Sequence, residues 1–141
     1  MTFRSEIPVR FGDCDYAKIV YYPRFLHFCH VTMEELFAEV IGVPYHVAIV
    51  DEKVGYPTVK VDADYRKPVG FGETILMEAS VERLGNRSVD FRYEGRRKSD
   101  GETAFLIRSR AVAVHMDEWH SVPIPEHHRK GFETLLAPKD G

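Results

Sequence analysis

The sequence predicts an α+β domain in which one long helix packs against an antiparallel sheet of five strands. Apolar residues recur every three or four positions between residues 23 and 41, which is the period of a helix with one buried face. Four later stretches alternate apolar and polar residues, and the turn pairs Gly85-Asn86 and Asp100-Gly101 separate some of them. A helix followed by hairpin-connected strands is typical of the α+β class.

Length and composition limit the classes of protein. At 141 residues the chain is expected to form a single domain over residues 1–141. The formal net charge of −3 argues against general nucleic-acid binding, and no apolar run approaches the roughly 18 residues that span a membrane. Two cysteines, Cys14 and Cys29, are too few for a disulfide framework. We therefore expect free thiols in a cytoplasmic protein with no nucleic-acid or membrane partner.

The long helix carries its own start and stop signals. Pro23 stands at the first helical position and Gly42 follows the last periodic residue, and both are common at these places. The buried face is expected to comprise Leu26, Cys29, Met33, Leu36, Phe37 and Val40.

The strands are expected at residues 1–11, 57–66, 74–84, 88–98 and 103–116, with short helical segments at 44–49 and 125–136. The first strand should bury Ile7, Val9 and Phe11 by alternation. Residues 111–114 are apolar on both faces, as in a central strand, which favours an oligomer. The terminal helix should turn Phe132, Leu135 and Leu136 inward.

Two carboxylates, Asp13 and Asp15, lie in the loop between the first strand and the helix. One interpretation is that either residue caps a turn or the helix start, which Asp often does. The other is that a carboxylate among apolar loop residues acts as a base or nucleophile, because desolvation would raise its pKa. Since the two acids alternate along the loop, we expect only one to point into a site.

The start of the helix is the second candidate feature. Backbone amides at a helix N-terminus carry partial positive charge and lack intrahelical acceptors. An amide near Tyr22 and Pro23 would stabilise an oxyanion on an ester or thioester, an effect worth roughly 3 to 4 kcal/mol per donor in known enzymes.

Other chemistries receive less support. His27 and His30 lie on neighbouring helical positions, but no third ligand has convincing spacing, so we expect no metal. The run from His127 to Lys130 is interpreted as a solvated helix face. Cys14 lies beside two acids, which disfavours its thiolate. The chain contains no Gly-rich phosphate loop and no G-x-S-x-G motif.

The same loop resembles the 4-hydroxybenzoyl-CoA thioesterase family of hotdog-fold proteins. The resemblance rests on Arg10-Phe11-Gly12-Asp13-Cys14-Asp15, Ala17, Ile19-Val20, Tyr21-Tyr22-Pro23, Gly55-Tyr56-Pro57, Asp64-Tyr65, Lys67-Pro68, Gly72-Glu73 and Arg87-Ser88. It implies a hotdog fold, a five-stranded antiparallel sheet wrapped around one long central helix, here with a short C-terminal helix. It also implies dimers that usually pair into tetramers, with sites at the dimer interface.

The resemblance also implies residue roles. Asp15 would be the nucleophile or the general base, and the backbone amide of Tyr22 would polarise the thioester carbonyl. Residues implied in substrate binding are Ile19, Val20, Pro23, His30, Tyr56, Pro57, Arg87 and Ser88. Arg87 would contact the CoA nucleotide. CoA is part of the substrate, and we expect no separate cofactor.

Two positions depart from the family pattern. Lys18 stands where these loops often carry Gly, which predicts a changed loop geometry or access. His30 stands where the 4-hydroxybenzoyl enzyme has an acid facing the ring hydroxyl.

The resulting hypothesis is an acyl-CoA thioesterase for a small aromatic acyl group, resembling 4-hydroxybenzoyl-CoA. The alternatives are a thioesterase for acyl-carrier protein or short aliphatic chains, and a non-catalytic acyl-CoA binding domain.

Overall fold

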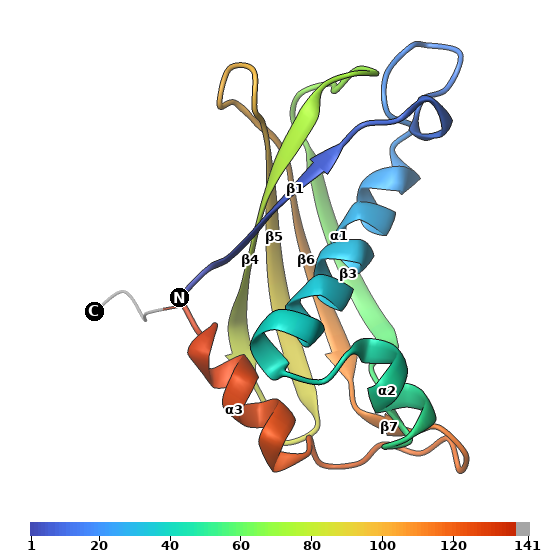
Figure 1. The fold of residues 1–141 in the computed structure, drawn as a ribbon, viewed down its shortest axis with the longest axis vertical. Coiled ribbons are helices and arrows are strands. Elements are labelled where there is room, and N and C mark those ends of the chain that lie inside the picture. The colour runs from blue at the N-terminus through green and yellow to red at the C-terminus, as the bar shows by residue number, and fades with distance from the viewer. Residues whose placement is uncertain (138–141) are drawn as a thin grey trace.

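A computed structural model describes residues 1–137 and shows a long helix lying across one face of a curved antiparallel sheet (Figure 1). The sheet order is β1–β4–β5–β6–β3. The elements are β1 (Phe3–Pro8), α1 (Pro23–Leu36), α2 (Tyr45–Val50), β2 (Val54–Gly55), β3 (Thr58–Tyr65), β4 (Thr74–Leu84), β5 (Ser88–Arg97), β6 (Thr103–Val112), β7 (Val114–His115) and α3 (Glu126–Thr134). The hotdog arrangement predicted for the fold is therefore confirmed. Positions 138–141 of the predicted domain lie outside the described residues.

The core fills the space between α1 and the sheet. β4 and β5 turn alternate residues toward the helix, so that Ile75, Met77, Val89 and Phe91 are buried. Burial of large apolar side chains is the main favourable term of folding, at about 25 cal/mol per Å². No helix within residues 1–137 is long and apolar enough to cross a membrane.

α1 begins at Pro23 as predicted and continues through a π-helical turn, Phe37–Ile41, to Gly42. Gly42 has φ +85°, the left-handed conformation that a glycine adopts without strain at a helix end. The predicted buried face is partly wrong, because Leu26 is 39% exposed. Phe25 and Phe28 are buried instead. The helix is therefore rotated so that their rings cover the sheet, with Phe25 4.6 Å from the Phe105 ring between centroids.

The first strand is shorter than predicted. β1 ends at Pro8, and residues Phe11–Asp13 form a 3-10 turn that redirects the chain toward α1. Phe11 is not in the core, because its side chain is 80% exposed; its ring packs edge-on against Phe71, at 5.9 Å between centroids.

The predicted strand 103–116 is divided in two. β6 ends at Val112, and Val114–His115 pairs with Val54–Gly55 in a separate two-stranded sheet. The Ala113 amide still donates to the carbonyl of Arg87, in register with β5. The division follows this residue, because the His115 and Met116 amides donate to the carbonyls of His120 and Lys53 instead.

α3 packs over the end of α1, and Phe132 and Leu135 are buried as predicted, whereas Leu136 is exposed. The interpretation of residues 127–130 as a solvated face is wrong for His128, which is fully buried. α3 approaches the segment between α2 and β2, and His128 points into that contact.

We predict that Gly95→Ala lowers the free energy of unfolding by about 1–3 kcal/mol, because a Cβ there would overlap the buried ring of Phe105 on the neighbouring strand. Urea denaturation measures the change. Gly12→Ala is the control, since a Cβ at Gly12 meets nothing within 4 Å. Equal stability of the two variants would contradict the close packing of β5 on Phe105.

Candidate active site

The loop between β1 and α1 is held by its own backbone. The amide of Asp15 donates to the Ile19 carbonyl at 3.1 Å, and the amide of Lys18 donates to the Asp15 carbonyl at 3.0 Å. Further along, the amide of Val20 donates to the Val69 carbonyl at 2.8 Å, which joins the loop to the segment before β4. These hydrogen bonds give the loop one defined path.

Lys18 has φ +68°, in the left-handed region that favours glycine. The departure from the family pattern therefore leaves the backbone of the turn in the conformation that a glycine would adopt. A lysine holds this conformation at a cost of about 1 kcal/mol.

Asp13 and Asp15 lie in opposite environments. Asp13 is 5% exposed and accepts hydrogen bonds from the Arg10 amide at 2.9 Å and from the Arg24 guanidinium at 2.7 and 3.1 Å. Burial alone would raise the pKa of Asp13, but the Arg10 amide and Arg24 outweigh it and hold this pKa below the ordinary value. Asp13 is thus an ionised anchor between the loop and α1.

The Asp15 side chain is exposed, and one of its oxygens accepts a hydrogen bond from the Ala17 amide at 2.8 Å. The prediction that apolar surroundings raise the pKa of a loop carboxylate is therefore wrong for this chain, because Asp15 is exposed and the pKa of the buried Asp13 is lowered. Cys14, between the two acids, has a raised thiol pKa because of burial and both negative charges, as expected. Of the two carboxylates in this loop, Asp15 is therefore the one that is open to solvent.

The start of α1 offers a free donor. The Arg24 and Phe25 amides donate to the carbonyls of Tyr21 and Tyr22, and Pro23 has no amide hydrogen. Within residues 1–137, the amide of Tyr22 makes no hydrogen bond. It carries the partial positive charge of the helix N-terminus and is available to a substrate oxygen.

A mostly apolar cavity of about 490 Å³ opens beside this donor. It is lined by Ile19, Val20, Tyr22, Phe25, Tyr65, Arg66, Lys67 and Pro68. The rings of Tyr22 and Phe25 both contact Tyr65, at 5.9 and 5.7 Å between centroids. Sequence reasoning missed Phe25 in this site, although its position four residues before Cys29 continues the same helical face.

Most of the predicted substrate residues divide between the two ends of the sheet. Ile19, Val20 and Pro23 share the end of the sheet where β3 finishes at Tyr65, whereas Pro57 precedes β3 at its other end. Tyr56 is buried there. Its contact with substrate, like that of Pro57, stays a prediction.

Arg87 and Ser88 also lie far from Asp15 in one protomer, at the turn between β4 and β5 (Figure 1). Arg87 donates to the carbonyl and hydroxyl oxygens of Ser121 at 2.8 and 3.0 Å. The eleven residues of β4 separate this turn from the Asp15 loop by about 35 Å. A single chain therefore cannot bring the two groups together.

His30 lies between the two ends, midway along α1. It is half exposed, pairs with Glu34 at 3.1 Å, and lines a second apolar cavity of about 240 Å³ between α1, β3 and β6.

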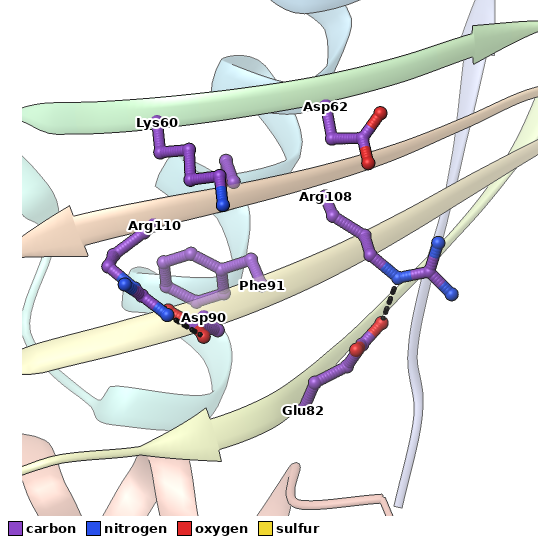
Figure 2. A pocket seen from close by; sticks show the side chains of 8 residues that line it. Lys60, Asp62, Glu82, Asp90, Phe91, Arg108 and Arg110 are labelled. Atoms are coloured by element: carbon purple, nitrogen blue, oxygen red, sulfur yellow. Dashed lines mark hydrogen bonds and ion pairs between the residues drawn. The ribbon is translucent and has the colours of Figure 1, made fainter.

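A third cavity, of about 140 Å³, lies on the charged face of the sheet (Figure 2). Its lining includes three basic and three acidic side chains: Lys60, Arg108, Arg110, Asp62, Glu82 and Asp90. Arg108 and Arg110 each donate to an acid, Glu82 and Asp90, at 2.8 Å (Figure 2). Because these charges balance, the cavity is a poor site for the phosphates of CoA.

A separate cluster of titratable groups was missed by sequence reasoning. His127 Nε2 lies 2.7 Å from one oxygen of Glu52, and His128 Nε2 lies 2.6 Å from the other. Burial lowers the pKa of His128, although its hydrogen bond to Glu52 acts in the opposite direction. Glu52 and His127 are 75 residues apart, so no local spacing indicated the cluster.

We predict that Asp13→Asn lowers the free energy of unfolding at pH 7 by about 1–3 kcal/mol, because Arg24 loses its buried partner. The folded-state pKa of Asp13 is lowered, so its contribution is complete above the ordinary Asp pKa and disappears as the pH falls through the lowered value. Urea denaturation from neutral to acid pH measures this. Exposed Asp51, changed to Asn, is the control; a pH-independent difference would contradict the anchor.

Comparison with known proteins identifies the family. The sequence model that represents the thioesterase-like superfamily matches residues 9–132 of this chain. A 1,4-dihydroxy-2-naphthoyl-CoA hydrolase from Prochlorococcus marinus is 28% identical over 139 residues, which covers 94% of this chain and 91% of that protein.

Solved structures agree with this match. A thioesterase superfamily protein from Jannaschia sp. CCS1 has a TM-score of 0.89 at 28% identity and covers 97% of this chain and 94% of its own. A 1,4-dihydroxy-2-naphthoyl-CoA thioesterase from Synechocystis has a TM-score of 0.87 at 21% identity, covering 98% and 100%. The chain therefore belongs to the thioesterase-like superfamily and is a thioester hydrolase with the hotdog fold.

Proposed function

We propose that this thioesterase hydrolyses an acyl-CoA with a small aromatic acyl group, and that Asp15 is its catalytic carboxylate. The observation that carries the proposal is the apolar cavity lined by Tyr22, Phe25 and Tyr65, beside the Asp15 loop and the free amide of Tyr22. The relative from Prochlorococcus marinus, named for an aromatic naphthoyl thioester, supports the same substrate class.

The cavity suits a flat aromatic ring. Its volume of about 490 Å³ falls within the roughly 300–1,000 Å³ of ordinary ligand pockets. Aromatic rings at its wall offer faces and edges against which a ring stacks, an arrangement worth about 0.5–1.5 kcal/mol per pair beyond burial. Lys67 at the same cavity adds positive charge for the phosphates of CoA, whereas the guanidinium of Arg66 is paired with Asp64 at 2.9 Å.

The chemistry needs one carboxylate and one amide donor. The Tyr22 amide would donate to the thioester oxygen as negative charge develops on it. Asp15 would either attack the carbonyl carbon, expel the CoA thiolate and form an anhydride that water then cleaves, or take a proton from an attacking water. Both routes use the same two groups and yield the free acid and CoA.

We also propose that two protomers pair along β3. Within residues 1–137 this strand is an edge of the sheet and is hydrogen-bonded to β6 alone. Val59 and Val61 on it are 61% and 46% exposed. Unpaired edges with exposed apolar residues readily accept another strand.

Antiparallel pairing about a two-fold axis would bring the two groups of predicted site residues together. The Tyr65 end of β3 in one protomer would lie beside the Thr58 end in its partner. Asp15 and the aromatic cavity would then face the partner's Pro57 and Arg87, and the second protomer would supply the enclosure that Asp15 lacks. Further pairing of these dimers into tetramers remains part of the proposal.

The proposed location is the cytoplasm. Cys14 and Cys29 are both free thiols, and Cys29 is buried in the core. Unpaired cysteines fit a reducing compartment, where acyl-CoA is found.

Thiol release from a panel of thioesters tests the function. We expect kcat/KM above roughly 10⁴ M⁻¹s⁻¹ for 1,4-dihydroxy-2-naphthoyl-CoA or 4-hydroxybenzoyl-CoA, and lower values for short aliphatic acyl-CoA and for the same acyl groups on carrier protein. Asp15→Asn should reduce kcat at least 100-fold. Asp51→Asn, an exposed control, should leave kcat unchanged. Comparable kcat for Asp15→Asn and wild type would defeat the assignment of Asp15.

The dimer is tested at the β3 edge. Val59→Asp with Val61→Asp should convert the oligomer into folded monomers, because charges then oppose each other across the two-fold axis. Sedimentation measures the mass, and circular dichroism checks the fold. Val50→Asp, in α2, is the control because Val50 is also 61% exposed. An unchanged mass for the doubly substituted protein would exclude this edge as the interface.

A further inference from the structure

We propose that Glu52, His127 and His128 form a binding site for a divalent transition-metal ion such as Zn²⁺. The site lies where α3 meets the segment between α2 and β2, away from the Asp15 loop. Among the described residues, it is the only group of three or more potential ligand side chains whose ligand atoms lie within 4.8 Å of one another.

The ligand atoms already converge. Nε2 of His127 and Nε2 of His128 face the two oxygens of one carboxylate, at 2.7 and 2.6 Å. A tetrahedral ion about 2.0–2.2 Å from each ligand needs each nitrogen and its facing oxygen to separate by about 0.6–1 Å, which rotation of the Glu52 and His127 side chains would supply. The ion would replace the two hydrogen bonds to Glu52 with coordination bonds.

The burial of these side chains is graded from core to solvent. The His128 side chain is fully buried, that of Glu52 is 29% exposed and that of His127 is 54% exposed. His128 thus gives a fixed ligand at the inner end of the cluster. His127 leaves an entry path and room for a water as a further ligand.

Tyr56 supports the inner ligand. Its hydroxyl lies 2.7 Å from Nδ1 of His128, the ring nitrogen that does not face Glu52. When Nε2 binds the ion, the proton of the neutral ring moves to Nδ1 and donates to the Tyr56 oxygen. A hydrogen bond from the outer nitrogen of a metal-bound histidine to the protein fixes its ring in this way.

The donor set indicates the class of ion. Two imidazoles and one carboxylate suit Zn²⁺, Ni²⁺, Co²⁺ or Cu²⁺, whereas Mg²⁺ and Ca²⁺ prefer sets made of oxygen. The ion would join Glu52 to His127 and His128, which lie 75 and 76 positions later in the chain. It would therefore act as a staple that holds α3 on the α2 segment, and it would take no part in thioester hydrolysis.

Zinc titration of the untagged, EDTA-treated protein tests the site. By calorimetry we expect one equivalent of Zn²⁺ to bind, and at hundredfold the Kd the Tm should rise by about 5 °C or more. Co²⁺ at the same site should give visible d–d absorption that Zn²⁺ removes. Glu52→Gln and His127→Ala should each weaken the binding of Zn²⁺ at least about tenfold.

His120→Ala is the matched control. His120 also pairs with a glutamate, Glu118, but both residues are exposed and lie outside the proposed metal site. It should bind Zn²⁺ as wild type does. Absence of saturable binding up to about 100 µM Zn²⁺, or wild-type binding by both Glu52→Gln and His127→Ala, would overturn the site. The measurement uses no substrate, so its failure leaves the proposed hydrolysis untouched.

Discussion

Asp13 is removed from water at the point where the chain turns from β1 into α1, and its negative charge has to be balanced inside the protein. Arg24, in the first turn of the helix, supplies that balance with two hydrogen bonds. The pair joins the loop to the helix and thereby fixes the position of Asp15 relative to the free amide of Tyr22. A buried charge left without its partner is costly, so this geometry is tied to the stability of the fold.

The length of the sheet places a second constraint on function. The aromatic cavity lies at one end of β3, and the turn that carries Arg87 lies at the other end of the sheet. A single chain therefore holds two incomplete parts of the proposed site. In the proposed dimer, pairing at the free edge of β3 would place the aromatic cavity of one protomer beside the Arg87 turn of its partner. The partner would then cover Asp15, which is exposed in a single chain.

The local pattern of residues was sufficient for the fold, because the helical period, Pro23, Gly42 and the alternating strands act over short distances. It was insufficient where distant segments decide the outcome. Phe11 is exposed because the chain turns toward α1, and Leu26 is exposed because packing sets the rotation of the helix. The run 103–116 divides after Ala113, where the backbone pairs with β2 instead of β5. For the site, the loop of Asp15 was predicted from the sequence and its resemblance. The Glu52 cluster was not, since its members meet only through tertiary packing.

The most direct test of the central claim is a subunit-mixing experiment with two variants, Asp15→Asn and Arg87→Glu, each altered in a different part of the site. Each variant alone should hydrolyse the aromatic acyl-CoA poorly. When subunits exchange in an equal mixture, half of the dimers contain one subunit of each variant. One of the two sites in such a dimer has both Asp15 and Arg87, so roughly a quarter of the wild-type rate should return. A mixture that exchanges subunits but gains no activity over the separate variants would contradict a site built from two protomers.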